Sequence, residues 1–314
     1  MQKQLDRAAQ EVGTVLLGKD KQIRLALCCL VAGGHLLLED LPGMGKTSLS
    51  HALAKVLGLQ YRRVQFTSDL LPGDILGVSI FNRATSATGE TVNALQFMPG
   101  PIFTQILLAD EINRSTPKTQ SALLEAMAEG QVTIEGATRP LPQPFFVIAT
   151  QNPISQAGTY ALPESQLDRF LMRLSLGYPD PSAERRLLKG EDAAHQLPKL
   201  QQCLTPEQLL KLQAAVDTIH TSDALLDYVQ RLIAYTRNQT GFAYGLSPRG
   251  ALALLRSAKA WALLNGRGHV VPEDVQLVLP AVVEHRLHSQ SGAFDAAAEG
   301  GALVDRLLRE VPIV

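Results

Sequence analysis

Short apolar runs alternate with helix-period patterns over the first part of the chain, up to residue 180. Each run is bounded by polar, glycine or proline residues, which is typical of strands buried on both faces of a parallel sheet. We expect five such strands, at residues 35–39, 62–65, 105–110, 145–150 and 171–176. Helices are expected between them, at 46–57 and 116–129. This alternation predicts an α/β fold in which helices cover both faces of a parallel sheet.

The pattern changes near residue 180, where the proline-rich segment YPDPSAE at 178–184 ends the strand region. Only helices are expected after it, at residues 205–220, 222–237, 247–265 and 272–283. The first of these carries one apolar stripe, made of Leu209, Leu210, Leu212, Val216 and Ile219. The sequence therefore predicts two domains, an α/β domain over residues 1–180 and an all-helical lid domain over 181–314.

The first apolar strand ends in a glycine-rich turn within the sequence HLLLEDLPGMGKT, residues 35–47. A strand, a glycine-rich turn and a helix in this order form an anion site, because the helix N-terminus presents free N–H groups and a favourable dipole. Gly43 and Gly45 can adopt backbone angles that bring the chain close to a ligand. The segment therefore predicts a loop that holds the phosphates of a nucleotide.

Two side chains at the end of this loop have defined chemistry. Lys46 would reach the β- and γ-phosphates, and the hydroxyl of Thr47 would hold Mg²⁺. The strict P-loop pattern fails at one position, because Asp40 stands where the first glycine is usual. The core of the motif is intact, and we expect the nucleotide to contact Pro42, Gly43, Met44, Gly45, Lys46, Thr47 and Ser48.

A second strand ends in two acids, within the sequence ILLADE at residues 106–111. Open α/β sheets bind ligands at the carboxyl ends of their strands. We expect Asp110 to hold Mg²⁺ opposite Thr47, and Glu111 to polarise the attacking water as a general base. The alternative is that the two acids only cap the strand and begin the next helix.

Two more positions are candidates for contact with the γ-phosphate. Asn152 ends the apolar strand FFVIATQN and could orient the hydrolytic water, although Asn-Pro is also a favoured turn. Arg169, in the sequence LDRF, could reach the nucleotide of a neighbouring subunit, where an arginine supplied in trans stabilises transition-state charge. Its alternative role is a local ion pair with Asp168, and Arg173 is the rival candidate for the role in trans.

Arg249 lies in the first turn of a predicted helix that Ser247 would cap and Pro248 would begin. A cation is disfavoured there by the helix dipole, so a nearby anion would explain it. Nucleotide phosphate is one such anion, and a local carboxylate is the other. With ATP bound between the sheet domain and the lid, Arg249 would stabilise the transferring phosphoryl group together with Lys46 and Asn152.

The chain resembles the MoxR-type AAA+ ATPases. The motifs that carry the resemblance run in order and cover most of residues 14–275, namely LEDLPGMGKT, FTSDLLPGDILG, MPGPIF, LLADEINRSTPKTQSALLEAMAEGQVT, ATQNPISQAGTYALPESQLDRF and LSPRGALALLRSAKAWALLNGR. The resemblance implies an AAA+ P-loop NTPase sheet domain, followed by the helical lid, in a hexameric ring with ATP at the subunit interfaces. It implies that Asn152 is the sensor 1 residue, Arg169 the arginine finger and Arg249 the sensor 2 arginine.

The same resemblance implies two elements that face the central pore of the ring or its rim. One is an insertion near helix 2, at about residues 77–97, and the other is a hairpin before the sensor strand, at about 131–141. From composition, LPGD at 71–74 and the small residues at 84–89 are expected to be loops around a short hairpin.

On the adenine side, the resemblance implies base contacts from Leu17 and Gly18. Lys19 stands where glutamine is usual in the family. A preference for ATP over GTP is likewise implied by the family, and the chain contains no guanine-reading NKxD segment.

Charge and cysteine content limit what the chain binds. Its 29 basic and 30 acidic residues give a net charge of −1 without a block of like charge. Nucleic-acid binding normally leaves a basic footprint, so charge disfavours DNA or RNA as a ligand. The three cysteines do not have the spacing of a metal site.

The first ten residues, MQKQLDRAAQ, are charged and polar and contain no apolar core of a secretory signal. No run in the sequence approaches the roughly 20 apolar residues that span a bilayer. We therefore expect a cytoplasmic protein without direct membrane insertion.

The resemblance implies a chaperone-like remodelling ATPase that assists maturation of protein complexes. Members of the family commonly work with a protein that carries a von Willebrand factor A-type domain, so such a partner is expected here. The alternative is a nucleic-acid motor of the helicase or branch-migration type, which would use the pre-sensor hairpin on DNA. That hairpin offers Arg139 beside Glu135 and little net positive charge.

Overall fold

The computed structural model describes residues 2–85, 91–152, 160, 162–191, 193–289 and 296–313. Its centre is a five-stranded sheet whose strands lie in the order β2-β5-β8-β1-β9, and every neighbouring pair is parallel. Its strands are β1 His35–Glu39, β2 Tyr61–Gln65, β5 Ile106–Asp110, β8 Phe146–Gln151 and β9 Phe170–Leu174. All five predicted strands are present within two residues of their expected limits, which confirms the α/β fold class.

Alternate side chains of each central strand enter two different cores. Leu36 and Leu38 of β1 pack with helices α1 Gln2–Val15, α2 Asp20–Val31 and α3 Lys46–Val56. Leu37 points to the other face and packs with Leu123 and Met127 of α5 Pro117–Glu129. Because successive strand residues face opposite sides, both faces of the sheet are apolar and covered by helices.

The strand order determines where the ligand site lies. The chain leaves β1 toward the edge strand β2, works back through β5 and β8, and then passes to β9 on the other side of β1. Ligands bind at such a switch point, beside the carboxyl ends of the strands. Glu39, Asp110 and Gln151, the last residues of β1, β5 and β8, therefore lie along one edge of the sheet.

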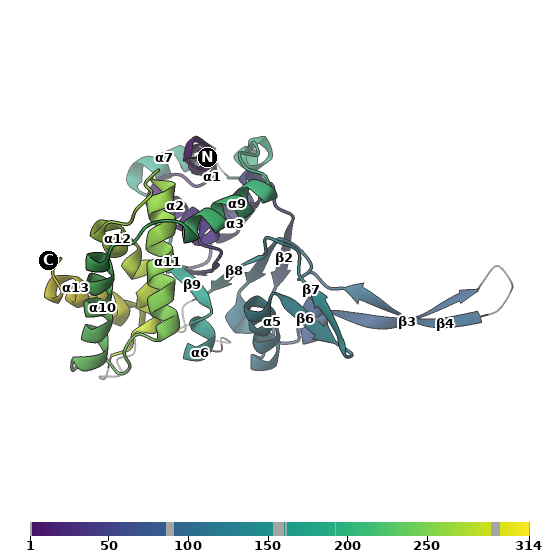
Figure 1. Cartoon of the computed structure of the whole chain (residues 1–314). Helices are drawn as coiled ribbons and strands as arrows, with labels where there is room; N and C mark the ends of the chain where they lie inside the picture. Colours follow the sequence, from purple (N-terminus) through teal and green to yellow (C-terminus); the bar gives the residue numbers. More distant parts are fainter. Residues whose placement is uncertain are drawn as a thin grey trace.

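The helical part follows the last strand (Figure 1). It consists of α7 Pro181–Leu188, α8 Ala193–Gln196, α9 Pro206–Asp217, α10 Asp223–Asn238, α11 Pro248–Leu264, α12 Pro272–Val283 and α13 Ala296–Glu310. Shorter elements are α6 Glu164–Leu167 and the 3-10 helices η1 Ile112–Arg114, η2 Leu197–Lys199 and η3 Glu284–Arg286. The described elements after residue 180 are all helical, in agreement with the lid fold, while the division at 180 itself stays a prediction.

The N-terminal helices link the two parts. Helix α1 packs on α3, and α2 packs on both α9 and α11. The buried residues of α1 recur at helical spacing, Leu5, Ala8, Val12 and Val15. One continuous apolar cluster therefore runs from the sheet through α1 and α2 into the later helices.

A long β-hairpin extends from the body of the molecule (Figure 1). Strands β3 Gly77–Thr85 and β4 Thr91–Pro99 have nine residues each and pair from Gly77 with Pro99 to Thr85 with Thr91. The prediction of a short hairpin was therefore wrong in length. The LPGD segment is not a loop either, because it begins the short helix α4 Pro72–Leu76. The predicted loop at 84–89 lies mostly outside the described residues.

The pre-sensor hairpin consists of β6 Gln131–Ile134 and β7 Ala137–Pro140, paired antiparallel. Its Arg139 places the guanidinium carbon 3.9 Å from the ring centroid of Phe97 on β4. The two hairpins are thus joined by a cation–π contact. Among the described residues, no helix is long and apolar enough to cross a membrane.

We predict that Gly100→Ala destabilises the fold where the long hairpin meets the body. A methyl group on Gly100 would overlap the carbonyl oxygen of Ile75 and the amide nitrogen of Gly77, and backbone atoms cannot turn aside. The expected cost is about 1–3 kcal/mol, as for other overpacked sites. Urea unfolding of the two proteins measures it.

The matched control is Gly268→Ala, because a methyl group at Gly268 meets no atom within 4 Å. The same free energy of unfolding for both variants would contradict the assigned close packing at Gly100.

Candidate functional site

The glycine-rich turn joins β1 to α3. Gly43 and Gly45 have φ angles of 87° and 90°, in the left-handed region that favours glycine. Gly45 is the residue that caps α3, so the free N–H groups of this helix open onto the turn. A side chain at Gly45 would also meet the Cδ1 atom of Leu16, 2.7 Å away. The turn is therefore closed on one side by the α1–α2 connection and open on the other.

A cavity of about 310 Å³ lies at this turn. It is lined by Pro42, Gly43, Gly45, Lys46, Thr47, Ser48, Asp110, Glu111 and Asn152. Most of the nucleotide-contacting positions expected from the sequence are thus brought together with both acids and the asparagine. Met44 does not line the cavity and packs partly against the main core.

Lys46 is only 7% exposed and its ammonium group contacts the turn itself. The Nζ atom donates to the carbonyl oxygens of Asp40 and Leu41, the latter at 3.2 Å, and to Oδ1 of Asn152 at 3.5 Å. Burial lowers the pKa of Lys46, and the nearby carboxylates, Asp40 first, oppose that shift. An anionic phosphate in the cavity would favour the charged lysine in the same way.

Glu111 is held in place from three sides. Its Oε1 accepts from Nδ2 of Asn152 at 3.0 Å, and its Oε2 accepts from Nε2 of Gln65 at 2.8 Å. Oε2 also pairs with Nε of Arg114 at 3.0 Å. These contacts fix the carboxylate at the mouth of the cavity, where it can accept a proton from a bound water.

The backbone of Glu111 is also unusual, with φ 55° and ψ 47°. A non-glycine residue in the left-handed region is uncommon, and such strain is concentrated at functional sites. The amide of Glu111 donates to Oγ1 of Thr150 at 2.8 Å, which stabilises this conformation. The side chain lines the cavity beside Lys46 and Asp110.

Asp110 is 6% exposed and both of its oxygens have partners. Oδ1 accepts from Oγ1 of Thr150 at 2.6 Å, and Oδ2 accepts from Nη2 and Nε of Arg63 at 2.6 and 3.0 Å. A carboxylate has about four lone-pair sites, so Asp110 can still ligate a metal. With the hydroxyl of Thr47 in the same cavity, the donors are all oxygens, which is the set that Mg²⁺ prefers.

Four residues of this network were missed by sequence reasoning, namely Arg63, Gln65, Arg114 and Thr150. Arg63, Gln65 and Thr150 lie beside the acids because β2 and β8 flank β5, and only knowledge of the strand order would have placed them there. Arg114 lies three residues after Glu111, so its ion pair could have been inferred from the spacing.

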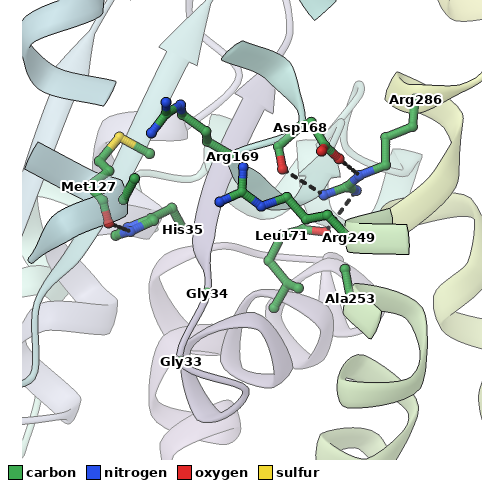
Figure 2. Close-up of a pocket in the computed structure, with 11 residues that line it drawn as sticks. Gly33, Gly34, His35, Met127, Asp168, Arg169, Leu171, Arg249, Ala253 and Arg286 are labelled. Carbon is green, nitrogen blue, oxygen red and sulfur yellow. Dashed lines mark hydrogen bonds and ion pairs between the residues drawn. The ribbon is translucent and has the colours of Figure 1, made fainter. Parts of the chain in front are cut away.

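The two candidate arginines line a different cavity, of about 210 Å³ (Figure 2). Arg169 and Arg249 come from the turn before β9 and from the start of α11, and Arg286 lies beside them (Figure 2). Nη1 of Arg169 donates to the carbonyl oxygen of Leu124 at 2.8 Å. Within the described ranges, neither Arg169 nor Arg249 pairs with a carboxylate. Their charges are therefore available to an anion from outside the chain.

Arg286 was not predicted, and it organises this turn. Its side chain is 5% exposed, and Nε donates to Oδ1 of Asp168 at 2.7 Å. Nη2 donates to the carbonyl oxygen of Phe170 at 2.7 Å. The ion pair expected between Asp168 and Arg169 is thus replaced by one between Asp168 and Arg286, which leaves Arg169 without a carboxylate.

The two cavities lie at opposite ends of β1. Gly34 and His35, at its start, line the arginine cavity, whereas the phosphate loop follows its end. A five-residue strand spans about 16 Å. Arg249 therefore does not line the cavity that contains Lys46 of the same chain, contrary to the expectation that it would act there. The local helix start was read correctly, but its position relative to the sheet edges depends on the fold.

Arg173, the rival of Arg169, is engaged within the chain. It lies on β9 with a side chain 12% exposed, paired with Glu39 at 2.9 Å and with Glu284 at 3.5 Å. Breaking these pairs would leave two partly buried carboxylates without this partner. Arg173 is thus engaged by carboxylates of its own chain, whereas Arg169 donates to the carbonyl oxygen of Leu124.

The adenine-side loop adjoins the turn that leads to α7. Leu17 is buried, and Gly18 has φ 69° and lies against Asp180 and Ala183. Lys19 is also buried and donates its Nζ to the carbonyl oxygen of Tyr178 at 2.5 Å. Neither Leu17 nor Gly18 lines the phosphate cavity, but Leu16 beside them contacts Gly45. Lys19, which stands where the family usually has glutamine, therefore forms a hydrogen bond within the chain.

Comparison with known proteins agrees with this geometry. Residues 35–172 match the family model "ATPase family associated with various cellular activities (AAA)", and residues 234–307 match the "AAA lid domain". The chain is 42% identical to the uncharacterized protein YeaC of Bacillus subtilis, over 98% of this chain and 94% of that protein.

It is also 39% identical to the chaperone MoxR1 of Mycobacterium tuberculosis, over 98% of this chain and 82% of that protein. A crystal structure of a Cytophaga hutchinsonii protein, described by its name as a candidate ATPase, superposes with a TM-score of 0.85 at 36% identity. The superposition covers 100% of this chain and 96% of the other. The chain therefore belongs to the MoxR family of AAA+ ATPases.

Proposed function

We propose that this protein hydrolyses ATP in a Mg²⁺-dependent reaction, as one subunit of a ring that remodels or matures protein complexes. The observation that supports it most is the single cavity lined by Lys46, Thr47, Asp110, Glu111 and Asn152. Phosphate-binding, metal-binding and water-activating groups meet there, while two arginines lie at the other end of the sheet.

The residues of the cavity divide the chemical work. The N–H groups of α3 and the ammonium of Lys46 hold the phosphates. Thr47 and Asp110 hold the Mg²⁺ ion, which neutralises phosphate charge when bound. Glu111 accepts the proton of the attacking water, and Asn152, which donates to Glu111, keeps that carboxylate and the water in line. Leu17 and Gly18 contact the base beside the turn.

The positions of Arg169 and Arg249 require a second copy of the chain to complete the ATP site. Because β1 separates Arg169 and Arg249 from the phosphate loop of their own chain, they would act on the ATP of a neighbouring copy. An arginine supplied in trans is worth about 10³–10⁵ in rate. We therefore propose that ATP lies at subunit interfaces, and that the ring is a hexamer, as the family resemblance implies.

The client is proposed to be a protein. The relative MoxR1 is named a chaperone, and the long hairpin exposes Phe81 (81%) and Leu95 (54%), apolar side chains suited to a polypeptide surface. A partner with a von Willebrand factor A-type domain follows from the family resemblance. Arg139, the cation that a nucleic-acid motor would use, is instead stacked on Phe97.

We predict that Glu111→Gln binds ATP with wild-type affinity and turns it over at least about 10²-fold more slowly, because the amide cannot accept the proton. Lys46→Ala is expected not to bind ATP at all. Calorimetric titration gives the affinities, and phosphate release gives the rates. Wild-type turnover by Glu111→Gln would remove this residue from the role of base, and normal ATP affinity of Lys46→Ala would refute the site.

We predict that mixed rings of Arg169→Ala and Lys46→Ala subunits regain part of the activity that each variant lacks alone. At some interfaces, an intact phosphate loop from the first variant meets an intact Arg169 from the second. ATP turnover across mixing ratios measures the recovery. Rings of Lys46→Ala mixed with the double variant are the control, since no interface there is complete. Equal activity in both mixtures would place Arg169 in a structural role.

We predict that tagged Glu111→Gln, trapped with ATP in native lysate, retains a protein with a von Willebrand factor A-type domain. The Lys46→Ala variant should lose that protein, because capture would require bound nucleotide. Mass spectrometry of the two eluates identifies the difference. Recovery of nuclease-sensitive material or only of DNA-repair proteins would instead favour the nucleic-acid motor.

A further inference from the structure

Asp40, which replaces the first glycine of the strict P-loop pattern, connects two distant segments. Its Oδ2 atom accepts from the amides of Leu176 and Gly177 at 2.6 and 2.8 Å, and from Oγ of Ser175 at 3.1 Å. These three residues follow β9 and precede α7, so they begin the passage from the sheet to the later helices. A glycine at position 40 could make none of these contacts.

The contact has the form of an anion-binding nest. The amides of two successive residues, Leu176 and Gly177, both donate to the same carboxylate oxygen. Successive N–H groups arranged in this way bind anions, and charge-assisted hydrogen bonds are about twice as strong as neutral ones. Asp40 is half-buried, so solvent competes only partly for its charge.

The backbone of the same residue touches the phosphate site. Its carbonyl oxygen accepts from Nζ of Lys46, and its amide donates to the carbonyl oxygen of Gln151 at 3.4 Å. Gln151 ends β8, directly before Asn152. The main chain of Asp40 thus contacts Lys46, the lysine expected to bind phosphate. The side chain of Asp40 contacts residues 175–177, at the start of the passage to the lid.

We propose that Asp40 is a positioning residue that transmits the state of the phosphate site to the helices after residue 180. The inference rests on the proposed ATP site. A phosphate draws the ammonium of Lys46 away from the Asp40 carbonyl, the backbone at residue 40 adjusts, and the carboxylate carries residues 175–177 with it.

Other contacts hold the same passage without involving Lys46 or residue 40. Lys19 binds the carbonyl oxygen of Tyr178, and Asp180 caps α7 by accepting from the amides of Ser182 and Ala183. They keep the passage folded without Asp40. Loss of its carboxylate therefore breaks the link while the protein stays folded, which makes the inference testable.

The test compares Asp40→Gly with the wild type. The variant restores the usual P-loop glycine, so nucleotide affinity is expected to be unchanged. Amide exchange at Leu176 and Gly177 should be about tenfold faster or more, because charge-assisted bonds are lost. Spin labels at Lys118→Cys on α5 and Gln230→Cys on α10 report lid position, in a Cys203→Ser background. Cys28 and Cys29 are buried and need no replacement.

In the wild type, the distance between labels should differ between ADP and a slowly hydrolysed ATP analogue. In Asp40→Gly it should be the same with both nucleotides, and Asp40→Asn, which keeps an acceptor oxygen, should recover part of the difference. Thr205→Ala is the control, because it removes only the cap of α9 and should behave as the wild type.

A full nucleotide-dependent difference in Asp40→Gly, with faster amide exchange, would overturn the inference. So would a wild-type distance that is the same with both nucleotides. Failure of the wild type to bind either nucleotide would instead refute the proposed ATP site and the inference with it. If Asp40→Gly does not fold, Asp40→Asn and Ser175→Ala provide the test. A nucleotide-dependent change in label distance as large as that of the wild type in both variants would contradict the proposed role of Asp40.

Discussion

The parallel register of β1 between β8 and β9 is the constraint on which the rest of the structure depends. Parallel strands place all their carboxyl ends at one edge of a sheet. The phosphate loop after Glu39, the acids at Asp110 and Glu111, and Asn152 after β8 therefore meet in one cavity. The same register places the start of β1 and the turn before β9 at the opposite edge, with Arg169 and Arg249. One chain thus carries the phosphate-loop cavity and the arginine cavity at opposite edges of the same sheet.

Within the cavity, neutral side chains keep a cluster of acids in order. Thr150 donates to Asp110 and accepts from the amide of Glu111, so a single hydroxyl orients two carboxylates and supports a left-handed backbone. Arg63 and Arg114, each more than a third exposed, add positive charge from the solvent side. The hydrogen bonds of Thr150 offset the energetic cost of the left-handed backbone at Glu111 and also orient the two carboxylates.

Features that depend on residues close together in the sequence could be predicted, whereas features that depend on contacts between distant segments could not. Strands and helices came within a few residues because apolar spacing is local. Lys46, Thr47, Asp110 and Glu111 could be expected at one edge of the sheet because each lies at or just after the end of a strand that its own residues specify. Other features depend on which segments become neighbours in the fold. They are the cavity that Arg249 lines, the roles of Thr150 and Arg286, and the length of the β3–β4 hairpin. Helix α1 was not predicted, although Leu5, Ala8, Val12 and Val15 recur at helical spacing in its sequence.

Asp40 illustrates this limit most clearly. In the sequence it is a departure from a motif, and the simplest expectation is a weaker phosphate loop. Its partners lie 135–137 residues away, and they are brought to it because β9 runs beside β1. The carboxylate accepts from two backbone amides and the Ser175 hydroxyl, whereas Lys46 donates to the main-chain oxygen of Asp40, so the side chain adds a link without withdrawing Lys46 from the cavity. The phosphate turn requires the backbone freedom of glycine at residues 43 and 45 but tolerates a side chain at residue 40. A residue that departs from a motif can therefore form a contact that the motif does not describe.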